Sequence, residues 1–177
     1  MEEIKAGKEG AFNELYKRYG TKIFRYFFRL LNQDKEKAED FLQDFFVRIV
    51  EQIQRYQANQ KVSTWLYAIA TNMCRNEWRN KQTREKILLS IKNEKEEQSD
   101  STEKWLDHKM AESAVLTSIE ELDESDKELL TLRFQQDLSI KEIAEITGLV
   151  EGTVKSRLFY LLKKLGKKLK AYDVIQN

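Results

Sequence analysis

The chain has 177 residues and a formal net charge of +1, with a single cysteine, a single histidine and no proline. Lone Cys74 and His108 exclude an internal disulfide and a Cys/His zinc cluster, and His108 lies in a polar stretch far from any nucleophile-like motif, so we expect no metal, no cofactor and no enzymatic activity. No apolar run approaches the roughly 20 residues that cross a bilayer, and the N-terminal MEEIKAGKEG has no hydrophobic leader, which predicts a cytoplasmic protein without membrane insertion.

The spacing of apolar residues favours an all-α fold. Six glycines and no proline leave few turn signals for strands, while apolar residues recur three and four positions apart. The first such segment, AFNELYKRYGTKIFRYFFRLL at 11–31, predicts a long helix with an aromatic face. A second helix is expected after Asn32 and Asp34, with apolar residues from Ala38 to Ile53 along one side.

The opposite side of this second helix carries Asp40, Gln43, Asp44 and an apolar Val47. At 100° per residue these four lie within about 100° of one another. The pattern fits either a solvated face or an acidic patch that docks on a basic protein surface.

A third helix is expected to begin near Ser63 or Thr64, either of which can cap it, and to run toward Arg84. One flank of this helix carries side chains that donate hydrogen bonds to bases and phosphates, namely Asn72, Arg75, Asn76 and Arg79. The surrounding aromatic residues are Tyr56, Trp65, Tyr67 and Trp78. Arginines among aromatic rings suit the unstacked bases of single-stranded DNA, although the rings could equally belong to the core.

The stretch from 81 to 110 is a predicted linker with some helical tendency. Its seven basic and seven acidic residues cancel, and the apolar periodicity decays. The simplest organisation is therefore two small helical domains, at 1–80 and 111–177, joined by a polar linker.

The segment EIAEITGLVEGTVKSRL at 142–158 predicts a helix-turn-helix. A short helix of about eight residues would begin at Ser139 or Ile140, and a second helix at about Glu151. Gly148 can take the positive φ that turns the chain, and Ala144 is small enough for a close helix crossing. An ordinary helical hairpin would account for the same residues.

Charge favours nucleic-acid binding by the second of these helices. Residues 111–152 hold eleven acidic and three basic residues, whereas 153–170 hold seven basic residues and no acidic one. Cations near a helix C-terminus suit the helix dipole, but two of the seven lie near the N-terminal end. The polar side chains expected there beside buried Val154 and Leu158 suit the DNA major groove; they are Thr153, Lys155, Ser156 and Arg157. One surface suited to duplex DNA and another suited to opened strands indicate promoter melting.

Three motifs in this order resemble the compact extracytoplasmic-function (ECF) group of bacterial sigma factors, which keep only regions 2 and 4. They are AEDFLQDFFVRI at 38–49, WLYAIATNMCRNEWR at 65–79 and LSIKEIAEITGLVEGTVKSRL at 138–158. The chain departs from the family in having Val62 where a phenylalanine is frequent, and Leu122–Asp123 where a leucine–proline pair opens region 4.

The resemblance implies a region 2 helical bundle at 1–80, a region 4 helix-turn-helix at 111–177 and a sigma factor that directs core RNA polymerase to promoters. It implies that Asp40, Gln43 and Asp44 contact the clamp helices of the largest polymerase subunit, and that region 4 touches the flap of the second-largest subunit. The same resemblance assigns the −10 element to Asn72, Arg75, Asn76 and Arg79, and the −35 element to Thr153, Lys155, Ser156 and Arg157. Promoter DNA, double- and single-stranded, and an anti-sigma factor are the remaining implied partners.

Two other functions remain open from the residues. An autonomous helix-turn-helix repressor would bind a palindrome as a dimer without polymerase. A protein-interaction module of the anti-sigma kind would support no promoter-dependent transcription.

Overall fold

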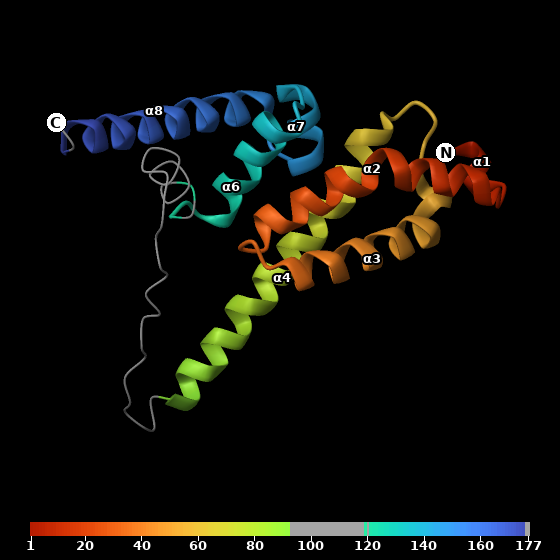
Figure 1. Ribbon diagram of the computed structural model, residues 1–177, viewed down its shortest axis with the longest axis horizontal. Helices are drawn as coiled ribbons and strands as arrows, with labels where there is room; N and C mark the ends of the chain where they lie inside the picture. Colours follow the sequence, from red (N-terminus) through yellow and green to blue (C-terminus); the bar gives the residue numbers. More distant parts are fainter. Residues whose placement is uncertain (93–118, 120, 176–177) are drawn as a thin grey trace.

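The computed structural model describes residues 1–92, 119 and 121–175. The N-terminal half contains α1 (Glu2–Lys5), α2 (Glu9–Leu30), α3 (Lys35–Gln52), the 3-10 turn η1 (Ile53–Arg55) and α4 (Val62–Lys92). The C-terminal half contains α6 (Glu124–Leu130), the π-helical turn η2 (Thr131–Gln135), α7 (Ile140–Thr147) and α8 (Glu151–Ile175). The described residues form helices and no strands, which confirms the expected all-α fold (Figure 1).

The turn between α2 and α3 is built as the sequence predicts. Asn32 and Gln33 take positive φ angles of 57° and 61°, a conformation that asparagine tolerates well. Asp34 then caps α3, because its side chain accepts a hydrogen bond of 3.0 Å from the backbone N–H of Lys37. The cap fixes the angle at which α3 returns along α2.

The start of α4 differs from the prediction. The expected cap at Ser63 or Thr64 is wrong, since α4 already begins at Val62 and the N–H of Trp65 bonds the carbonyl of Lys61 at 3.1 Å. Thr64 instead lies buried in the first turn, and its hydroxyl has no hydrogen-bond partner among the described residues. The helix therefore begins two or three residues earlier than the polar residues suggest.

The other end of α4 continues to Lys92, so the first part of the predicted linker is helical. Residues 81–92 contain neither glycine nor proline, and Lys81 and Glu85 form an i,i+4 ion pair at 3.8 Å. The rest of the predicted linker, 93–110, lies outside the described residues, as does His108.

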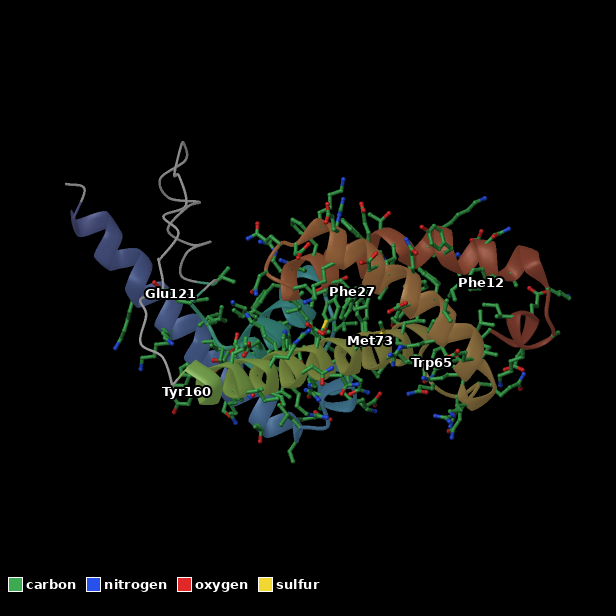
Figure 2. The ribbon with its side chains drawn as sticks, turned by 90° about the horizontal axis from the view of Figure 1, so that it is seen from below. Phe12, Phe27, Trp65, Met73, Glu121 and Tyr160 are labelled. Carbon is green, nitrogen blue, oxygen red and sulfur yellow. The ribbon has the colours of Figure 1, made fainter. Side chains whose placement is uncertain are left out.

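The core of the N-terminal bundle lies between α2, α3 and α4. Tyr26 and Phe27 are fully buried, and Phe27 meets the ring of Phe45 edge-on with centroids 5.9 Å apart. Figure 2 shows Phe27 and Met73 within the packed interior of this bundle. The hydroxyl of Tyr26 shares a hydrogen bond of 2.7 Å with that of Thr71, so the one polar atom that the ring carries into the core is satisfied.

The predicted helix-turn-helix is confirmed. Ser139 and Glu142 form a capping box at the start of α7, and Gly148 takes φ 74° at its end. Helix α8 begins at Glu151, and Ile143, Val154 and Leu158 are buried where α7 and α8 pack.

The two halves of the chain are packed together. Helix α7 lies against α4, and α6 contacts α2, while α8 and the far end of α4 project away from the N-terminal bundle (Figure 1). Across the described ranges, no helix is both long enough and apolar enough to span a membrane.

Candidate nucleic-acid interface

Three of the four predicted single-strand contacts on α4 form an open row. Asn72, Asn76 and Arg79 are exposed, and their spacing places them on one line of the helix surface. Arg75 lies at the edge of this row and is half-buried. The structure therefore brings the four residues to one side of α4 but leaves only three of them uncovered.

Arg75 is held by the C-terminal half of the chain. Its guanidinium donates to both carboxylate oxygens of Glu128 on α6, at 3.0 and 2.7 Å, and to the carbonyl oxygen of Thr147 on α7 at 3.2 Å. Two parallel bonds to a carboxylate form the strongest geometry available to arginine. Arg75 thus spans the boundary between the halves.

Glu128 was not anticipated from the sequence. Its side chain is only 1% exposed, and burial raises the pKa of its carboxyl while the Arg75 guanidinium opposes that rise. The sequence held only a weak signal for Glu128. It lies three residues before Thr131 and four before Leu132, both buried, so helical periodicity predicts an apolar side chain at position 128.

The aromatic residues near α4 were left open between stacking surfaces and core, and the structure places most of them in the core. Tyr56, Trp65 and Tyr67 are buried, and the rings of Tyr56 and Trp65 meet edge-on with centroids 5.4 Å apart. Trp78 is half-buried and donates through Nε1 to the carbonyl of Leu30 at 3.4 Å. The alternative of core aromatics therefore holds.

Helix α8 presents a second polar row. Thr153, Lys155 and Ser156 are exposed, while Val154 and Leu158 on the other side are buried. Helix packing thus turns the predicted duplex-contacting side chains outward.

Arg157 differs from the other three because it is tied to α6. Its guanidinium donates to the hydroxyl of Ser125 at 2.7 Å and to the carboxylate of Asp126. The side chain therefore fixes how α8 leaves the domain in this structure.

The polar face of α3 is also open. Asp40, Gln43 and Asp44 are exposed, and Val47 among them is 57% exposed. Neither Asp40 nor Asp44 forms an ion pair within the described parts of the chain. A bare acidic patch with an apolar centre is a suitable surface for a basic protein partner.

Two sequence models match the chain: Sigma-70 region 2 over residues 15–84 and Sigma-70, region 4 over residues 112–165. The RNA polymerase sigma factor YlaC of Bacillus subtilis is 31% identical over 137 residues, which cover 76% of this chain and 78% of YlaC. The chain belongs to the sigma-70 family, in its ECF group. Region 2 thus contains most of α2 with α3 and α4, and region 4 contains α6, α7 and most of α8; these regions are the promoter-recognition modules of the family.

Other relatives cover nearly the whole chain. The ECF sigma factor SigW of Bacillus subtilis is 29% identical over 179 residues, covering 96% of this sigma factor and 95% of SigW. The ECF sigma factor BldN of Streptomyces coelicolor is 26% identical over 170 residues, covering 96% of this chain but 64% of BldN.

Solved structures share the fold. The sigma factor RpoE from Bartonella quintana, in complex with the anti-sigma factor NepR, has a TM-score of 0.66 at 19% identity and covers 90% of this chain and 97% of its own. CnrH, in complex with the cytosolic domain of CnrY, has a TM-score of 0.67 at 20% identity, covering 94% and 92%.

A cleft of about 980 Å³ lies between region 2 and region 4 of this sigma factor. Its region 2 wall includes Lys22, Arg25 and Arg29 of α2, and its region 4 wall includes Asp137 and Glu142. None of the three α2 cations forms an ion pair with another described residue. The cleft is therefore positive on one side and negative on the other.

The last groups to consider among the described residues are possible metal ligands and the thiol of Cys74. Within the described ranges no three His, Cys, Asp or Glu side chains gather where they could hold a metal ion. Cys74 is a buried free thiol, and burial, followed by the negative charge of Glu128, raises its pKa.

Proposed function

We propose that this ECF sigma factor opens promoters by dividing the DNA between two helices, with region 4 reading the −35 duplex and region 2 holding the separated −10 strand. The observation that carries the proposal is the pair of outward-facing polar rows, on α8 and on α4, each backed by a buried apolar face. The two regions are the family's promoter-recognition modules, and each supplies one row.

The −35 contacts come from the exposed start of α8. Thr153 and Ser156 offer hydroxyls to base edges, and Lys155 offers an ammonium to a phosphate. Arg157 has two roles in this proposal. While it is bound to the carboxylate of Asp126 it positions α8, and it contacts DNA only after that bond breaks.

The −10 contacts come from Asn72, Asn76 and Arg79, with Arg75 joining when its bond to Glu128 is released. Extraction of a base costs a few kcal/mol, which hydrogen bonds to the extruded base must offset. Because the neighbouring aromatic rings are buried in the core, this chain relies on polar contacts more than on stacking.

Docking on core polymerase uses the α3 face. Asp40, Gln43 and Asp44 surround exposed Val47, and we assign this surface to the clamp helices of the largest subunit, with region 4 on the flap of the second-largest subunit. In this proposal the protein is a non-enzymatic initiation factor that catalyses no covalent step and acts on DNA in the cytoplasm. RpoE was solved with the anti-sigma factor NepR, which supports an anti-sigma protein as a further partner of this chain.

A run-off transcription experiment with core polymerase and a promoter library tests the proposal. Asp44→Ala should raise the concentration needed for half-maximal transcription about tenfold, a typical loss for a central interface residue. Its control is Glu39→Ala, which removes the same charge from another side of α3.

Arg79→Ala should lower promoter opening about tenfold, the loss that corresponds to one charged contact with DNA. Lys81→Ala, on the opposite side of α4, should leave it unchanged. Wild-type transcription by Arg79→Ala would refute the −10 role assigned to the α4 row. A footprint of the protein alone on a palindrome would instead favour a free-standing repressor.

A further inference from the structure

The acidic first half of region 4 lies against the basic face of region 2. Side chains from three separate parts of region 4 make polar contacts with region 2, in addition to the bond from Arg75 to the carbonyl of Thr147. Glu128 on α6 binds Arg75, Glu142 on α7 binds Lys61 at 2.7 Å, and Gln136 after η2 accepts from the hydroxyl of Tyr67. In each contact region 2 supplies the donor and region 4 supplies the oxygen, which is the polarity of a protein–nucleic-acid contact.

The covered face overlaps the surface that we assign to the opened −10 strand at Arg75, while the other three residues of that surface stay exposed. Arg75 belongs to the α4 row, and Lys61 directly precedes α4. The cleft beside them carries Lys22, Arg25 and Arg29 on its region 2 wall, none of which forms an ion pair with another described residue. Region 4 thus lies over part of a positive surface whose remainder is still open.

Two of the eleven acidic residues of 111–152 gain a role from this arrangement: Glu128, and Glu142, which also caps α7. We propose that an acceptor face of region 4, formed by Glu128, Gln136 and Glu142, occupies the Arg75 edge of the −10 strand surface of region 2 in place of DNA and keeps the free sigma factor closed. The inference rests on the proposed function of α4.

The chemistry of Glu128 suits a contact that can open. An apolar residue of similar volume would pack as well as a buried carboxylate, and often better, so stability alone gives no reason for an acid at this position. When region 4 closes onto region 2, the ionised carboxylate of Glu128 loses its bound water, and it regains this water when region 4 leaves. This cost of desolvation offsets the ion pair with Arg75, so the closed and open states stay close in free energy. The π-helical turn η2 directs the loop that places Gln136 against Tyr67, and such turns are frequent at functional sites.

The test compares the free, full-length chain with its variants. Glu128→Gln removes the charge that holds Arg75 and nearly preserves the volume, whereas Glu145→Gln removes an exposed charge from the neighbouring helix α7 and serves as the control. Binding of a fluorescent single-stranded −10 oligonucleotide is measured by anisotropy at fixed salt, because salt alone shifts such affinities. Small-angle X-ray scattering reports the radius of gyration of the same samples.

Glu128→Gln should bind the oligonucleotide about tenfold more tightly than wild type and have a larger radius of gyration, as expected when a binding-competent state becomes more populated. Glu145→Gln should match wild type in both measurements. Gln136→Ala changes only a loop contact, so it should fold even if Glu128→Gln does not, and it should tighten binding by about threefold.

Equal oligonucleotide affinity in wild type and in every folded variant would overturn the inference. The proposed function is decided separately, by transcription with core polymerase and the Arg79→Ala variant, in which region 4 closure plays no part. The two failures are therefore distinguishable.

Discussion

Glu142 is a heavily bonded carboxylate of region 4. It accepts hydrogen bonds from the backbone N–H and the hydroxyl of Ser139, at 2.8 and 2.7 Å, and from Lys61 at 2.7 Å. Burial acts to raise the pKa of Glu142, but the bonds from Lys61 and Ser139 outweigh it and lower the pKa from 4.5 to about 2. One side chain therefore caps α7 and ties region 4 to region 2.

The depressed pKa predicts how this contribution varies with pH. Because the pKa is lower in the folded chain, the stabilisation is complete above the ordinary value of 4.5 and is lost as pH falls toward about 2. Glu142→Gln should therefore be less stable than wild type at neutral pH, and the two should converge toward pH 2. Urea unfolding at a series of pH values measures this difference. Glu145→Gln is the control at neutral pH, and a gap for Glu142→Gln that stays constant down to pH 2 would contradict the assignment.

At the scale of elements, the turn between α7 and α8 depends on one glycine. Gly148 takes φ 74° and ψ 11°, and a Cβ built there would meet no heavy atom within 4 Å. Gly152, in the first turn of α8, also has open space, but its φ lies outside the left-handed region. The two positions therefore differ in backbone conformation and not in crowding.

This difference predicts opposite effects of the same substitution. Gly148→Ala should destabilise region 4 by about 1–2 kcal/mol, because an L-residue is strained in the left-handed region. Gly152→Ala should stabilise it by about 0.5–1 kcal/mol, because alanine is a better helix former. Thermal unfolding followed by circular dichroism compares the two, and shifts of the same sign would show that the turn does not control stability.

Local rules predicted these elements well. The Asp34 cap, the Ser139 capping box and the Gly148 turn each depend on residues within four positions of one another, so periodicity and cap chemistry suffice. The start of α4 was misplaced because Thr64 is a good cap by residue type but is buried by packing that the local pattern does not contain.

At the scale of the molecule, sequence reasoning predicted three candidate surfaces, most of whose residues are exposed, but missed how the halves meet. Arg75 and Glu128 are 53 residues apart, and Lys61 and Glu142 are 81 apart, so no periodic signal links them. The aromatic residues show the same limit: composition allowed Tyr67 to lie in the core or on the surface, and only the packing against Tyr26, with ring centroids 5.3 Å apart, decides between them.

The buried thiol of Cys74 has a consequence for oxidative chemistry. Peroxide attacks thiolates, and this sulfur is both fully enclosed and held protonated by its raised pKa. Peroxide treatment of the native chain should leave Cys74 unmodified, whereas the same treatment in urea should convert it to sulfinic or sulfonic acid. Mass spectrometry measures both products. Equal rates of oxidation would show that peroxide reaches the sulfur in the folded state. Because this cysteine is the only one in the chain, the folded protein carries no sulfhydryl on which an oxidant can act directly.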